Sequence, residues 1–84
     1  MSINIIVNTD KEIAIFVPEI GAKIISVCMV KNELIFTTVE KEVVIFTIDT
    51  KINELIRNKN KVLILEYDEE TSDIKTEKYY NIIY

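Results

Sequence analysis

The sequence predicts a mostly β fold: one domain over residues 1–84, built as a small antiparallel β-sandwich or barrel-like meander of six or seven strands. Isoleucine and valine dominate, with 17 Ile and 8 Val against 4 Leu. These β-branched side chains are stiff at χ1 and pack well on a pleated sheet. Short apolar runs alternate with polar turn residues, as in successive strands. A chain of 84 residues also has room for only one modest core.

Seven apolar segments have the length and composition of strands. The first two are joined by a turn signal and predict a hairpin, and the fourth and fifth predict another. The third is apolar almost without interruption and is expected at the centre of the sheet. The predicted strands span residues 2–7, 12–17, 24–30, 34–39, 42–48, 62–67 and 74–80, the last extending as far as 84 in its longest form.

The pattern of residues 50–60 favours a short helix, at about residues 50–58, over a further strand. This is the only helix that the sequence predicts. Ile52, Leu55 and Ile56 follow the i, i+3, i+4 spacing of a helix face. A strand would place Leu55 on the face opposite the other two. Polar residues able to begin and end the helix flank the segment, namely Asp49 or Thr50 and Asn58 or Asn60.

Turns that need a positive φ have few residues to use, because the chain has one Gly and one Pro. Asn and Asp tolerate this conformation best among the other residues, so Asn8 and Asn32 are the expected positions. Both Pro18 and Gly21 fall in residues 18–23, which are expected to connect the first hairpin to the central strand.

The residues that most enzymes and cofactor sites need are scarce, so the sequence predicts no enzyme, no cofactor and no metal. Histidine is absent, which removes the commonest general acid–base and zinc ligand. Cys28 is the only thiol and is expected in the core, between Val27 and Met29. A single glycine cannot build a phosphate-binding loop. An enzyme would need a site formed between subunits.

Two function classes are disfavoured by charge and hydropathy. Nucleic-acid binding needs a basic surface, and the one local basic cluster is Arg57, Lys59 and Lys61, so no direct nucleic-acid binding is expected. The longest apolar runs are too short to span a bilayer, and the N-terminus lacks the pattern of a signal peptide. We therefore expect no membrane association and a reducing, cytoplasmic location, which for a viral protein is the cytoplasm of the host cell.

The segment from Ile24 to Ile56 resembles one four-stranded blade of a WD40-type β-propeller. The resemblance lies in Ile-Ile-Ser-Val-Cys-Met-Val, Asn-Glu-Leu-Ile-Phe-Thr-Thr, Glu-Val-Val-Ile-Phe-Thr-Ile-Asp and Lys-Ile-Asn-Glu-Leu-Ile. It covers less than half the chain and lacks the Gly-His and Trp-Asp signatures of that family. It implies an antiparallel meander, with a strand at residues 51–56, and transfers no functional residue.

The net charge of −4 resides entirely in the last 19 residues. Residues 1–65 carry eight acidic and eight basic side chains, whereas residues 66–84 carry six acidic and two basic ones. Tyrosines lie among these acids, and Tyr is favoured at interfaces. The loop at 68–73 lacks the glycine of an EF-hand calcium loop. The predicted partner-binding residues are Glu66, Tyr67, Asp68, Glu69, Glu70, Asp73, Glu77, Tyr79 and Tyr80.

This pattern predicts a non-enzymatic, acidic protein-binding module that occupies a basic surface of another protein. By analogy, small acidic chains of this kind are often viral or mobile-element inhibitors of host nucleic-acid-handling or defence proteins. The alternative is a structural homo-oligomeric β protein whose acids only keep it soluble. In either case, sheet edges with few Gly or Pro residues favour a homodimer or a higher homo-oligomer.

Overall fold

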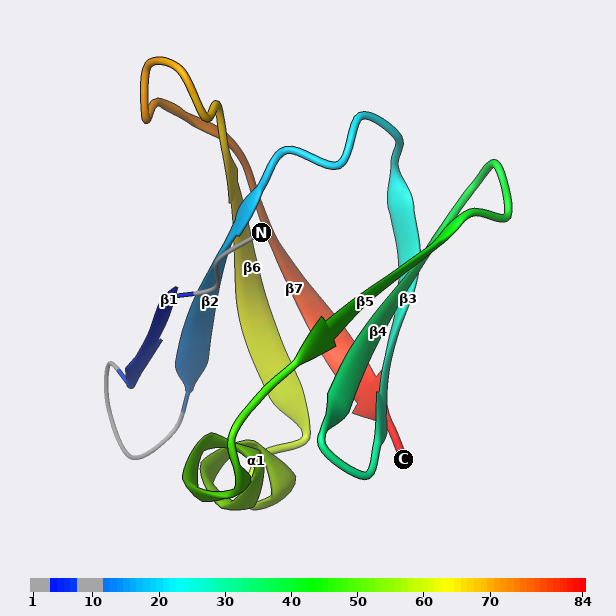
Figure 1. Cartoon of the computed structure of the whole chain (residues 1–84), viewed down its shortest axis with the longest axis vertical. Helices are drawn as coiled ribbons and strands as arrows, with labels where there is room; N and C mark the ends of the chain where they lie inside the picture. The colour runs from blue at the N-terminus through cyan, green and yellow to red at the C-terminus, as the bar shows by residue number, and fades with distance from the viewer. Residues whose placement is uncertain (1–3, 8–11) are drawn as a thin grey trace.

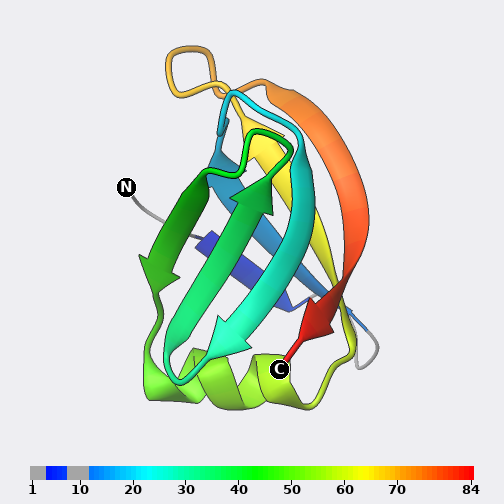
Figure 2. The same cartoon turned by 90° about the vertical axis from the view of Figure 1, so that its right-hand side faces the viewer.

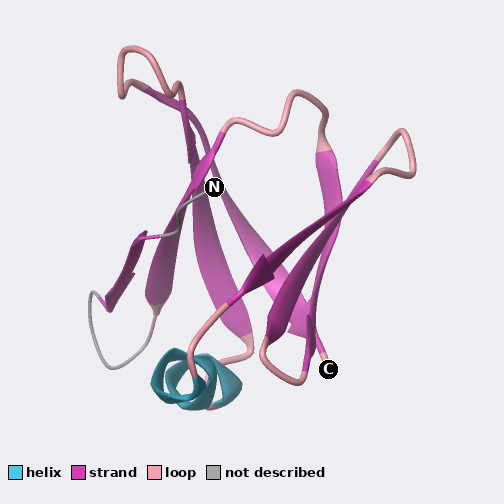
Figure 3. Cartoon of the chain, viewed as in Figure 1, coloured by secondary structure: helices cyan, strands magenta, loops and turns pink. Residues whose placement is uncertain are grey.

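The computed structural model describes residues 4–7 and 12–84, and it confirms the predicted mostly β class with one short helix (Figures 1 and 3). Residues 2, 3 and Asn8 of the predicted first hairpin lie outside the described residues. The elements are β1 (Asn4–Val7), β2 (Ile13–Pro18), β3 (Ile24–Val30), β4 (Glu33–Thr38), β5 (Val43–Thr47), α1 (Thr50–Arg57), β6 (Lys61–Tyr67) and β7 (Ile74–Ile83).

The strands form one strongly curled sheet in the order β1-β2-β6-β7-β3-β4-β5. Two half-sheets face each other, with β1, β2, β6 and β7 on one side and β3, β4 and β5 on the other (Figure 1). Figure 2 shows the second half in front, with α1 below both. The β2–β6 and β3–β7 pairs are parallel and the other four pairs are antiparallel. Residues 24–47 thus form a three-stranded antiparallel meander within this order.

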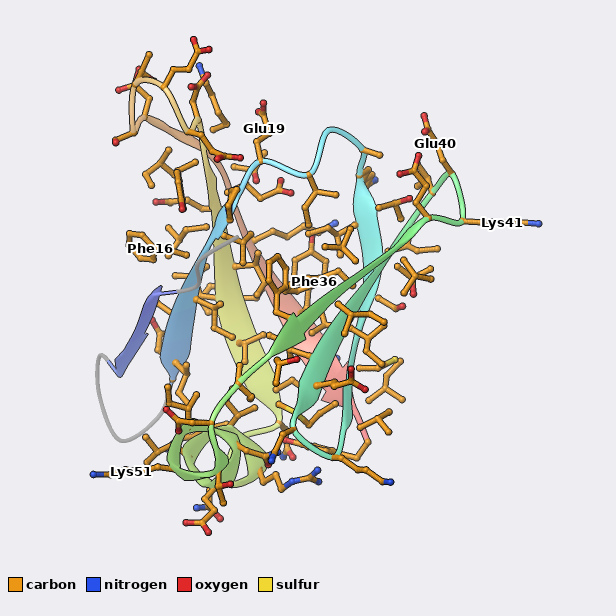
Figure 4. All side chains as sticks on the ribbon, viewed as in Figure 1. Phe16, Glu19, Phe36, Glu40, Lys41 and Lys51 are labelled. Carbon is orange, nitrogen blue, oxygen red and sulfur yellow. The ribbon has the colours of Figure 1, made fainter. Side chains whose placement is uncertain are left out.

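The core fills the space between the two half-sheets. Alternate side chains of β2 and β6 face inward, where they meet inward-facing residues of β3 and β4. Phe36 is fully buried at the centre, and its ring meets Phe46 edge to face, with centroids 5.5 Å apart (Figure 4). Burying each large aliphatic side chain stabilises the fold by roughly 1.5–3 kcal/mol.

The predicted helix is confirmed, with Asp49 as its N-cap and Asn58 as its C-cap. The Asp49 carboxylate accepts a hydrogen bond from the Ile52 N–H at 2.8 Å. Ile56 is fully buried under the two half-sheets, whereas Leu55 is exposed. The helix occupies the segment in which the blade-like pattern implied a fourth strand. In the described part of the chain, no helix is long and apolar enough to cross a membrane.

The outer face of the β3–β5 half-sheet carries an apolar row that the described residues leave uncovered, which corrects the prediction for Cys28. Val27 and Met29 are buried, so Cys28 between them lies on the outer face and is only half-buried. The sheet register sets it in a row with Ile83, Ile35 and Ile45. The continuous apolar run of β3 suggested burial on both faces, but nothing in the described chain packs over this row strongly enough to bury it.

A buried asparagine connects α1 to the β3–β4 turn. The amide nitrogen of Asn53 donates to the Lys31 carbonyl and to the Asn32 side-chain oxygen, the latter at 2.6 Å. Its amide oxygen accepts from the Arg57 Nε at 2.5 Å. The turn corrects the prediction for Asn32, because Lys31 takes the positive φ of 53° while the Asn32 side chain binds Asn53.

Replacing Asn53 with Ala should lower the free energy of unfolding by about 1–3 kcal/mol, because the hydrogen bonds of this buried amide to the β3–β4 turn and to Arg57 are lost. Urea unfolding followed by circular dichroism measures this loss. Glu54→Ala, at an exposed position of the same helix, is the matched control and should stay within about 0.5 kcal/mol of the unsubstituted protein. Equal stabilities of the two variants would contradict a structural role for Asn53.

Candidate functional site

The nine predicted partner-binding residues all belong to the β6–β7 hairpin, but they do not form one surface. Strand alternation places Glu66 and Tyr80 on the inner face, together with Thr76 and Lys78. Glu77 and Tyr79 lie on the outer face, while Tyr67 ends β6 half-buried. The remaining residues, Asp68, Glu69, Glu70 and Asp73, form the loop at the tip of the hairpin.

The tip loop is held by hydrogen bonds centred on Asp68. Its Oδ1 accepts from the backbone N–H groups of Glu70 at 2.8 Å and Thr71 at 3.2 Å. Its own backbone N–H donates to the Asp73 carbonyl at 2.9 Å, and its carbonyl accepts from the Ser72 N–H at 2.8 Å. Ser72 adopts a φ of 65° to close the loop. The loop therefore presents its acidic residues on a defined backbone.

The two backbone N–H groups also lower the pKa of Asp68 below its ordinary value, because they stabilise the carboxylate form. The Glu70 N–H has the larger effect, followed by the Thr71 N–H, with the charge of Lys75 acting in the same direction. At neutral pH the loop is consequently both ordered and negatively charged.

An open acidic depression of about 320 Å³ lies between the tip loop and the β2–β3 connector. Its walls carry the carboxylates of Glu19, Asp68, Glu69 and Glu70. Glu19 lies on this connector (Figure 4). Its backbone N–H donates to the Tyr67 carbonyl at 2.8 Å and joins the connector to the hairpin. Sequence reasoning missed Glu19, because it is an isolated acid almost 50 residues from the loop it joins.

The chemistry of this depression suits a cationic side chain. Within residues 4–7 and 12–84, no group of three or more acidic, Cys or His side chains is arranged to hold a metal. An ammonium or guanidinium group needs no such convergent geometry and gains from the combined negative potential of the four carboxylates. Guanidinium can also bind a carboxylate through two parallel hydrogen bonds.

The tyrosines have partners within the chain. The Tyr79 hydroxyl donates to Glu12 Oε2 at 2.8 Å, and the Lys61 ammonium lies 4.8 Å from its ring centre. The hydrogen bond to Glu12 is the main reason that the pKa of Tyr79 is raised. Burial, and then the charge of Glu66, raise the pKa of Tyr80. Tyr79 still exposes 45 % of its surface on the outer face of the hairpin.

Asp68→Ala should release the tip loop without unfolding the sheet, because it removes only the side-chain acceptor for two N–H groups. The amide chemical shifts of Glu70 and Thr71 report the loop. In the unsubstituted protein, the lowered pKa means that this stabilisation is complete above about pH 3.8 and is lost as the pH falls through the lower folded-state value. Amide shifts that titrate with a midpoint at or above pH 3.8 would contradict this account.

Comparison with known proteins adds no assignment to these surfaces. The chain matches no family model, and the searches find no similar curated protein and no similar solved structure.

Proposed function

We propose that this protein is a non-enzymatic binding module whose acidic hairpin tip occupies a basic surface on a partner protein. The observation that carries the proposal is the depression lined by Glu19, Asp68, Glu69 and Glu70. The hydrogen bonds of Asp68 fix the backbone around it. We propose that this depression receives a lysine or arginine side chain of the partner.

A preformed acidic tip favours binding for two physical reasons. Little loop ordering remains to be done on association, so less conformational entropy is lost. The concentrated negative charge also attracts a positive surface over several ångströms and speeds the encounter, an effect that salt weakens. Residues 1–65 balance eight acids with eight bases, so the attraction is directed to the hairpin end.

The partner class that fits this chemistry is a protein that handles nucleic acid. Its groove is lined with lysine and arginine side chains that normally neutralise phosphates. Carboxylates on a fixed hairpin tip can pair with those side chains and so exclude the nucleic acid from the groove. We propose that the module acts in this way as an inhibitor, of the kind that viruses and mobile elements use against a host protein.

Reversing the tip charge with Glu69→Lys and Glu70→Lys should lower the affinity for the partner at least tenfold, because two attractive charges become repulsive. The partner is captured from a lysate of the native host, identified by mass spectrometry and then purified for titration calorimetry. The matched control is Glu40→Lys with Glu42→Lys, which changes the net charge equally at exposed positions of the β4–β5 turn (Figure 4).

The control should bind the partner almost as tightly as the unsubstituted protein, and added duplex DNA should displace all forms that bind. Equal loss of affinity in both variants would show that only net charge matters. Unchanged affinity of the tip variant would show that the tip is not the binding site.

A structural homo-oligomer is the second candidate function, and the uncovered apolar row supports it. Ile83 and Ile45 at its ends are each more than half exposed, and Cys28 and Ile35 lie between them. The row ends at β5, which pairs with β4 on one side and forms the edge of the sheet. An exposed apolar edge of this kind favours pairing between chains.

Ile45→Lys should shift any such oligomer towards the monomer, because the charge would have to be buried at the contact. Sedimentation equilibrium over a range of protein concentrations measures the change. Glu54→Lys, on the exposed side of α1, is the control and should leave the association unchanged. A monomeric mass for the unsubstituted protein at every concentration would reject the oligomer.

A further inference from the structure

A second hollow, of about 500 Å³, lies on the inner side of the β6–β7 hairpin, opposite the β2–β3 connector. It exists because β7 pairs with β3 only near its end, so the two half-sheets separate above that contact. Its size falls in the usual range for small-molecule sites. The side chains that define its chemistry are Lys23, Ile24, Glu66, Thr76, Lys78 and Tyr80.

The wall of this cavity contains a carboxylate with unused hydrogen-bonding capacity. Glu66 is only 9 % exposed, which is unusual for an acidic side chain. Its Oε2 accepts from the Thr76 hydroxyl at 2.6 Å, whereas its buried Oε1 has no partner among the described residues. A carboxylate has about four acceptor positions, and buried acceptors are almost always satisfied. A donor brought by a ligand would supply the missing partner.

Two lysines bring the opposite charge to the same cavity. Lys78 follows Thr76 on the inner face of β7, and its ammonium lies 5.4 Å from the ring centre of Tyr80. Lys23 approaches from the connector on the other side. Both lysines are exposed, so their long side chains can adjust to a ligand. With Glu19 at the rim, the formal charges of the walls balance.

We infer that this cavity binds a small zwitterion, namely a free α-amino acid. The ammonium group of the ligand donates to the Glu66 carboxylate, and its carboxylate pairs with Lys78 and Lys23. Its side chain lies against Ile24 and Tyr80, which supply the apolar part of the wall. The two lysines would repel a purely cationic ligand, and Glu66 would repel a purely anionic one. This inference does not depend on the proposed partner of the hairpin tip.

The test is a titration of the ¹⁵N-labelled protein with each of the common amino acids at millimolar concentration, followed by amide chemical shifts. At least one amino acid should shift the amides of Gly21, Lys23, Thr76 and Lys78 in a saturable manner. Its N-acetyl and its amide derivatives should each bind at least tenfold more weakly, since each removes one of the two charges.

Glu66→Gln should weaken the binding at least tenfold while keeping an acceptor for Thr76. Glu77→Gln is the matched control, because it makes the same change on the outer face of β7, away from the cavity. This variant should bind the amino acid as tightly as the unsubstituted protein. If Glu66→Gln fails to give a dispersed spectrum, Lys78→Met at an exposed position serves instead, with the same expected loss. No saturable shift with any amino acid, equal binding of the derivatives, or unchanged binding by these variants would overturn the inference.

Discussion

The fold depends on one strand, β7, which is shared by the two half-sheets. It pairs with β6 in antiparallel register from Ile74 to Asn81, and only Ile82 and Ile83 pair with β3. The Ile82 N–H donates to the Asn60 carbonyl, and the Ile82 side chain is buried. The Tyr84 hydroxyl donates to the carbonyls of Ile56 and Lys59, which anchors the strand to the end of α1. The end of β7 thus contributes Ile82 to the core.

This arrangement closes the molecule near α1 and leaves it open at the opposite end. Buried side chains fill the space between the half-sheets, and α1 covers the end of this space near the β3–β7 contact. Above it, the sheets separate and the cavity beside Glu66 forms. The hairpin of β6 and β7 continues beyond the connector and carries the acidic tip. Both candidate sites are therefore consequences of where β7 leaves β3.

The local elements were predictable because their patterns are short-range. Alternating apolar residues identified the strands, and the spacing of Ile52 and Ile56 identified the helix. The parallel β2–β6 and β3–β7 pairs were not predicted, because they join segments far apart in the sequence. The role of Asn53 was missed for the same reason, since its partners lie in a turn more than 20 residues away.

The acidic segment was predicted as one surface, but strand alternation divides it. Sequence alone locates Glu66 among acids that look equivalent, whereas the register turns it inward and leaves Glu69 and Glu70 outside. Glu19 is the opposite case, because it is far from the tip loop in the sequence and the fold brings it beside that loop. Composition was thus enough to assign the negative charge to the C-terminal region. The division of its acidic residues between the tip and the cavity could be seen only from the pairing of β6 with β7.

The most direct test of this account is a nuclear Overhauser measurement on isotopically labelled protein. The parallel β3–β7 contact predicts close backbone protons between Val27 and Ile82 and between Cys28 and Ile83, alongside the antiparallel contacts of Ile64 with Lys78. Observing both sets in one spectrum would support the shared strand on which the cavity and the tip depend. Contacts from Ile82 to a different strand, or an antiparallel register with β3, would contradict it.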